Sequence, residues 1–166
     1  AVIDRIVDEN LFQYPTEKSI RKMVLTCIKR LRAMKDESLI YQIGTQPVDV
    51  AKQICLYAMM KQYRLIWDFM ITIVGEKYRM QDFSFGKKDV NVFFMQLREQ
   101  DAYVEGWSES TCNKIRQVII RIMVENEYLD NNKSEQLNPV WLNPMLENAI
   151  RNNNDDRALI AFNCFS

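Results

Sequence analysis

The stretch GWSESTCNKIRQVIIRIMVENEYL, residues 106–129, combines a turn, a helix start and an amphipathic helix. Gly106 and Trp107 form the turn, and the hydroxyl residues that follow are typical helix caps. At about 100° per residue, five apolar side chains share one face: Ile115, Val118, Ile119, Ile122 and Met123. The pattern predicts a helix over 109–125, and we expect Trp107 to pack beneath it.

The other side of this helix is polar and basic. Asn113, Lys114, Gln117 and Arg121 lie away from the apolar face, with Arg116 on its flank. Arg and Lys suit phosphates and guanine edges, and Asn and Gln suit adenine. Ser110 and Thr111 stand at the helix start, where free N–H groups attract phosphate. These residues form a hypothetical DNA contact. A solvated or protein-covered helix face explains them too, since Ile120 and Val124 lie on the same side.

The order of elements around this helix is that of a winged helix. A helix is predicted over about 88–103, followed by the turn, the helix over 109–125 and two apolar segments around a polar tip, 128–129 and 140–142. The two segments predict a small β-hairpin, with Lys133 at its tip as a further DNA-contact candidate.

A second basic face is predicted upstream. Pro15 and Thr16 begin a helix that runs to about Lys35, and seven basic but only two acidic residues lie between Thr16 and Asp36. Opposite its apolar stripe we expect the DNA-contact candidates Lys18, Arg21, Lys22, Lys29 and Arg32.

The middle of the chain predicts a buried helical core. Residues 48–78 are apolar on several faces, with helix breaks expected near Gln62 and Gly75. The stretch QDFSFGKKD, residues 81–89, is the expected boundary. The predicted fold is mainly α, with an N-terminal helical bundle over 1–82 and a winged-helix-like part with a small β-hairpin over 83–166. A final apolar segment, ALIAFNCF, is expected to dock back.

The amino-acid composition limits the classes of function that we expect. Lys plus Arg equals Asp plus Glu at 22 each, so an electrostatic argument must be local. The chain has no histidine, and its four cysteines show no C-x-x-C spacing, so we expect reduced thiols, no metal and no cofactor. Asp101 and Glu105 beside the turn are the candidate carboxylates for catalysis, but no P-loop or Gly-rich cradle accompanies them. We expect a protein that is not an enzyme and has no small-molecule substrate.

No segment predicts a membrane protein. The most apolar region, residues 54–74, is interrupted by Lys61, Arg64 and Asp68, and the acidic start AVIDRIVDEN is no signal peptide. We expect a cytoplasmic protein without membrane contact. The missing initiator Met suggests further residues upstream.

The chain resembles the BrxA family of bacterial BREX (bacteriophage exclusion) defence systems. The family's Trp-Ser-x-Ser-Thr-x-x-Lys block falls on Trp107, Ser108, Ser110, Thr111 and Lys114. Other matches are Pro15-Thr16 with Arg30-Leu31, the stretch LIWDFMITIVGEKY over 65–78, and Asp89 with Phe94. The family's Leu-x-Glu-x-Gly-Leu-Leu helix end corresponds to 123–129, where Asn126 and Glu127 stand in place of the glycine.

The resemblance implies a small helical protein without known catalytic residues, encoded with a methyltransferase, a phosphatase-like protein and ATPases. It implies DNA binding and a fold partly winged-helix and partly similar to transcription antitermination factors. We therefore expect a non-catalytic accessory of phage defence that contacts double-stranded DNA mainly through phosphates, alongside other proteins of the same system. The alternative is a scaffold whose helix over 109–125 docks on another component of that system.

Overall fold

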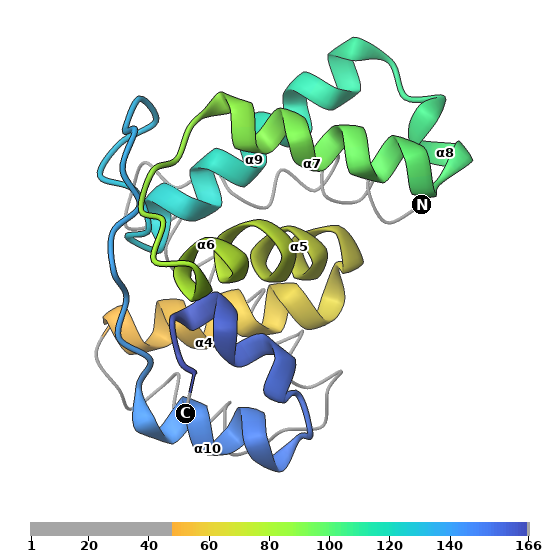
Figure 1. Cartoon of the computed structure of the whole chain (residues 1–166). Coiled ribbons are helices and arrows are strands. Elements are labelled where there is room, and N and C mark those ends of the chain that lie inside the picture. The colour runs from red at the N-terminus through yellow and green to blue at the C-terminus, as the bar shows by residue number, and fades with distance from the viewer. Residues whose placement is uncertain (1–47, 166) are drawn as a thin grey trace.

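The computed structural model describes residues 48–165, and this part is mainly helical (Figure 1). The predicted helix over about 16–35 lies outside the described residues. The DNA-contact candidates on this helix therefore remain predictions from the sequence. They are Lys18, Arg21, Lys22, Lys29 and Arg32.

The first helices form the centre of the described part. They are α4 (Val48–Gln62), α5 (Arg64–Phe69), the π-helical η1 (Met70–Gly75) and α6 (Glu76–Arg79). The predicted break near Gln62 is confirmed, because Tyr63 takes an extended backbone with φ −121° and ψ 109°. Tyr63, at this break, is only 1% exposed.

A second group of helices covers one side of this centre. It comprises α7 (Lys87–Gln100), α8 (Ala102–Glu105) and α9 (Glu109–Glu125), and the bounds of α9 are those predicted from the sequence. In Figure 1, α7 and α9 lie together beside α5 and α6. The rings of Phe69 and Phe93 meet edge to face at 5.2 Å between centroids and join the two groups.

The C-terminal segment docks back on the centre, as expected. Helix α10 (Pro144–Asn152) leads into the 3-10 helix η2 (Asp156–Phe162), which packs against η1 and α6. Tyr128 donates a hydrogen bond to the carbonyl of Ala161 at 2.7 Å. Burial raises the pKa of Tyr128 well above its ordinary value, so its hydroxyl stays protonated and remains a donor. The division at residues 82 and 83 stays a prediction.

The predicted β-hairpin is wrong. Residues 48–165 contain no strand, and one antiparallel bridge joins Ser84 to Gln136. Around it, the Phe85 amide donates to Glu135 at 3.1 Å and the Leu137 amide donates to Phe83 at 2.7 Å. Residues 135–137, just before the segment over 140–142 that was expected to close the hairpin, thus pair with residues 83–85, where Leu137 becomes fully buried.

Two physical reasons explain this outcome. Pro139 has no N–H group with which to extend a ladder. The pairing partner also comes from the inter-helical segment before α7, far away in sequence, which local alternation cannot indicate. The helix–turn–helix order of the winged-helix interpretation is present, while its hairpin is not.

The cysteines only partly follow the expectation. Cys112 and Cys164 are not part of a disulfide, whereas Cys55 is disulfide-bonded, so the prediction of reduced thiols is wrong for Cys55. Wide spacing in the sequence does not prevent a pairing that folding creates.

Among the described helices, none is long and apolar enough to cross a membrane.

Gly75 gives a stability prediction. Its backbone is ordinary helix, at φ −60° and ψ −42°, but an added Cβ would lie 2.6 Å from Cγ1 of Ile160. We expect Gly75→Ala to lower the free energy of unfolding by about 1–3 kcal/mol through overpacking, despite the better helix propensity of alanine. Urea titration measures the change.

The double variant Gly75→Ala/Ile160→Ala is the control for this clash. Removing the Ile160 side chain beyond Cβ leaves only Cβ of residue 160 near the added methyl group, at 3.3 Å, so alanine at position 75 should cost much less in an Ile160→Ala background. An equal loss in both backgrounds would exclude the clash as the cause.

Candidate functional site

A groove with a volume of about 1350 Å³ runs beside α9. Its sides are the start of α7, the outer face of α9 and the loop over residues 129–135. The polar residues that line it are Lys87, Asn91, Asn113, Arg116, Gln117, Arg121, Asp130, Asn131, Asn132, Lys133, Ser134 and Glu135. Between them, apolar atoms of Val90, Ile120, Val124 and Leu129 line the groove as well.

The lining of the groove has more basic than acidic side chains, although the whole chain has a formal net charge of zero. Its basic side chains are Lys87, Arg116, Arg121 and Lys133, and its acidic ones are Asp130 and Glu135. Amide side chains contribute donors and acceptors without charge. Such a lining favours an anionic ligand that also offers hydrogen-bond acceptors.

The guanidinium of Arg116 is held by two contacts. Its guanidinium lies over the ring of Phe94, 5.0 Å from the centroid, and Nη1 donates to Oδ1 of Asn113 at 2.7 Å. Its Nε is buried and has no hydrogen-bond partner. Phe94 is itself 1% exposed, so the guanidinium rests on the core and not on a mobile surface.

Helix α9 ends in a way that returns the chain toward the groove. Asn126 caps the helix with a right-handed backbone, and Glu127 takes the left-handed conformation at φ 66°. The amides of Glu127 and Tyr128 then donate to Val124 at 3.1 Å and Met123 at 2.8 Å. The left-handed residue is thus Glu127 and not Asn126.

Local hydrogen bonds hold the tip of the 129–135 loop. The Lys133 amide donates to Oδ1 of Asn131 at 2.9 Å, and the Asn131 amide donates to Oγ of Ser134 at 3.0 Å. Asn138 donates from Nδ2 to Oδ1 of Asp130 at 2.9 Å and closes the loop at its base. Lys133 is exposed on this ordered tip.

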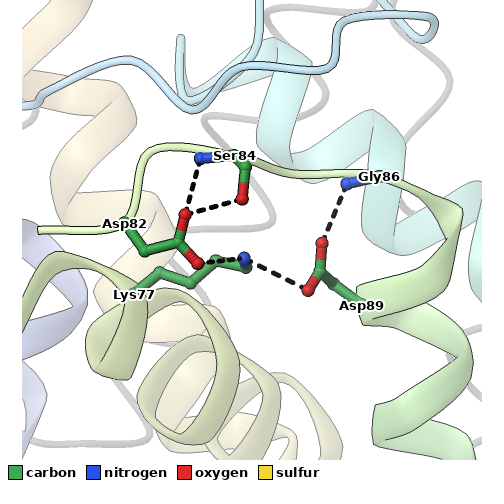
Figure 2. A network of polar contacts seen from close by, with 5 residues as sticks. All are labelled: Lys77, Asp82, Ser84, Gly86 and Asp89. Carbon is green, nitrogen blue, oxygen red and sulfur yellow. Dashed lines mark hydrogen bonds and ion pairs between the residues drawn. The ribbon is translucent and has the colours of Figure 1, made fainter. Parts of the chain in front are cut away.

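The α7 side is fixed by a polar network around Lys77 (Figure 2). The Lys77 ammonium contacts Asp82 at 3.2 Å and Asp89 at 3.1 Å, and its side chain is only 12% exposed. Asp89 accepts from the Gly86 amide at 2.9 Å, and Asp82 accepts from the amide and hydroxyl of Ser84 at 3.0 and 2.6 Å. Together these contacts tie α6 to the segment before α7 and so place the start of α7.

The same network shifts the titration of Asp82. Hydrogen bonds from the Ser84 hydroxyl and amide, and then from Lys77, lower the pKa of Asp82 to about 2 from its ordinary 3.8. The carboxylate therefore stays charged in the folded state under conditions that would protonate it in an unfolded chain.

The structure divides the predicted contact residues. Asn113, Arg116, Gln117, Arg121 and Lys133 come together in the groove. Ser110, Thr111 and Lys114 do not line it. Ser108, the N-cap, accepts from the Thr111 amide at 3.1 Å, and their hydroxyls are 2.9 Å apart, so Thr111 serves the cap.

Sequence reasoning missed Lys87 and Asn91 in this lining. The pair Lys87-Lys88 directly after a predicted boundary was a signal, but nothing local indicates that α7 starts beside the outer face of α9. Trp107 is partly buried, as expected of its position, and forms an edge-to-face pair with Tyr103 at 6.3 Å. The other turn residue, Asp101, caps α8 by accepting from the Tyr103 amide at 2.9 Å.

In the described part of the chain, no group of three or more His, Cys, Asp or Glu side chains could hold a metal ion.

Comparisons with known proteins add a family. The sequence model of the BrxA family matches residues 1–154. BREX protein BrxA of Bacillus cereus (strain H3081.97) is 33% identical over 135 residues, 81% of this chain and 67% of that protein. BREX protein BrxA of Paramagnetospirillum magneticum is 26% identical over 147 residues, 89% of this chain and 73% of that protein. A crystal structure of an uncharacterized protein from Magnetospirillum magneticum matches with a TM-score of 0.70 at 26% identity, covering 96% of this chain and 90% of that one.

The end of α9 gives a stability prediction. A left-handed backbone costs an L-residue about 1–2 kcal/mol, and glycine avoids that cost. Glu127→Gly should therefore raise the free energy of unfolding by about 1 kcal/mol, the net gain after the extra freedom of glycine in the unfolded chain. Glu127→Ala removes the charge and keeps the strain, so it should bring no gain. Equal melting temperatures of the two variants would contradict the backbone explanation.

The Lys77 network predicts a pH dependence. Because the pKa of Asp82 is lower in the folded state, its contribution is fully present above pH about 4 and disappears as the pH falls through about 2. Asp82→Asn should lose this contribution, so its stability should fall less steeply than that of the wild type between pH 4 and 2. Urea titrations across this range measure the difference. Ser84→Ala removes the largest cause of the shift and should behave in between, whereas parallel pH profiles for all three proteins would exclude this role.

Proposed function

The chain belongs to the BrxA family, and we propose that it serves a BREX phage-defence system by binding the phosphate backbone of duplex DNA in the groove beside α9. The supporting observation is the lining of that groove, where four basic side chains stand against two acidic ones in a chain of zero net charge. Phosphate contacts supply most non-specific affinity for DNA, and a local excess of cations is what they require.

In this proposal the groove residues act in two ways. Lys87 and Lys133 are exposed on opposite sides, at the start of α7 and at the loop tip, and reach phosphates as mobile charges. Asn113 and Gln117 on α9 offer hydrogen bonds to phosphate or sugar oxygens. Helix α9 then takes the DNA-facing place of a winged-helix-like unit, with the 129–135 loop in the place of the wing.

We propose no catalytic step for this protein. The chain has no histidine to act as a general base near neutral pH. Of the two carboxylates considered from the sequence, Asp101 is occupied as a helix cap. The proposal is an accessory role, in which other proteins of the same system act on the DNA and associate with this one.

A protein-interaction scaffold is the second candidate. One observation favours it: Trp141 is 79% exposed, although its backbone is fixed because its carbonyl accepts from Nε2 of Gln53 at 2.7 Å. A rigidly placed, exposed tryptophan is typical of protein interfaces. It lies outside the groove lining, so the two roles can be tested separately.

Charge reversal in the groove tests DNA binding. Lys87→Glu/Lys133→Glu should weaken binding to short labelled duplexes of two unrelated sequences alike, since phosphates carry no sequence information. Between about 50 and about 200 mM salt, the log–log slope should flatten by about 0.9 for each lost phosphate contact. Fluorescence anisotropy gives both quantities.

The matched control is Lys88→Glu/Arg157→Glu. It changes the net charge equally, at exposed positions that do not line the groove, and should leave affinity close to that of the wild type. Equal losses for both pairs would mean that overall charge is measured and not a site. Unchanged duplex affinity with loss of co-purification with other BREX proteins would favour the scaffold.

A further inference from the structure

Arg116 differs from the other cations of the groove in how it is held. Phe94 lies under one face of its guanidinium at 5.0 Å, and Asn113 holds Nη1 at 2.7 Å. Those contacts fix the plane and one corner of the group. On the other edge, formed by Nε and Nη2, Nε is buried and has no hydrogen-bond partner.

A buried N–H group without a hydrogen-bond acceptor lowers the stability of the fold unless a ligand supplies the acceptor. A buried N–H donor without a partner loses its hydration and gains nothing in return. Neighbouring side chains shield Nε, so solvent does not replace the missing acceptor. An acceptor that reaches Nε from the groove would therefore be a net gain.

From this geometry, and resting on the proposed function, we infer that Arg116 is the anchor of the groove, binding one backbone phosphate through Nε and Nη2 together. Two parallel N–H donors match two oxygens of a phosphate, a geometry that a lysine ammonium cannot reproduce. Phe94 and Asn113 act as positioning residues for the guanidinium, because Phe94 lies under its plane and Oδ1 of Asn113 accepts from Nη1.

The inference distinguishes Arg116 from Lys87 and Lys133. A mobile ammonium contributes charge, which salt screens. A pre-oriented guanidinium contributes geometry as well, so a substitution that keeps its charge still removes part of the binding. A charge-conserving substitution at Arg116 therefore measures the contribution of the anchor separately from the positive charge of the groove.

The test compares variants at Arg116 in duplex binding. Arg116→Lys keeps the charge and should weaken affinity about tenfold with an unchanged salt slope. Arg116→Gln should weaken it at least as much and also flatten the slope by about 0.9. In isotope-labelled protein, the Nε–H resonance of Arg116, identified by its absence in Arg116→Lys, should shift when the duplex is added.

Phe94→Leu tests the positioning role, with Phe93→Leu as its matched control. Both rings are buried on α7 at 1–2% exposure, but only Phe94 lies under Arg116, whereas Phe93 packs on Phe69. Both variants should lower the melting temperature. Only Phe94→Leu should also weaken duplex binding severalfold at unchanged salt slope and reduce the shift of the Arg116 Nε–H signal.

The outcomes separate the inference from the proposed function. A wild type that binds duplex while Arg116→Lys binds equally well overturns the anchor and leaves DNA binding standing. A wild type that binds no duplex overturns both. An Nε–H signal that responds to a BREX partner protein and not to the duplex would assign the same edge to a carboxylate of that partner, and overturns the phosphate inference.

Discussion

The backbone pairing of residues 83–85 with 135–137 is the contact on which the groove depends. It joins the segment before α7 to the segment after α9, so the two ends of the helix–turn–helix are held together. Leu137, fully buried, anchors one side, and the Lys77 network fixes the other. With both ends fixed, the start of α7 and the loop over 129–135 flank the outer face of α9. Loss of this pairing would separate the sides of the groove while leaving every helix intact.

What the sequence predicted follows from the range of the interactions involved. Helix α9 was predicted to the residue because its cap, its apolar face and its end are all encoded within about twenty neighbouring positions. The helix break at Tyr63 is local in the same sense. The bridge between Ser84 and Gln136 joins positions 52 residues apart, and the periodicity of neither segment predicts it. The predicted hairpin failed for that reason, and Lys87 was missed with it.

The candidate site shows the same division. Asn113, Gln117 and Arg121 were predicted because they share one face of one helix, and a wheel is enough to find them. Lys114 was predicted by the same wheel and Ser110 by its place at the helix start. Neither lines the groove, because its position is set by what packs beside α9 and not by α9 alone. Phe94 illustrates the limit most clearly. From the sequence it is a core residue of α7, and so it is, but its ring also carries the guanidinium of Arg116.

A neutral chain that binds a polyanion must concentrate its positive charge, and the fold offers a physical route to this. The acidic residues Asp82 and Asp89 share the ammonium of Lys77 beside the start of α7, which offsets part of their charge (Figure 2). Within the lining of the groove, the carboxylates that oppose the charge of Lys87 and Lys133 are those of Asp130 and Glu135. Mobile lysine side chains can reach phosphates at different positions, but they do not hold the duplex in one position. A single guanidinium resting on a buried ring supplies what they lack, because core packing, unlike surface charge, is not screened by salt. On the proposed function, affinity would then come from the lysines and position from Arg116, a combination suited to DNA of any sequence.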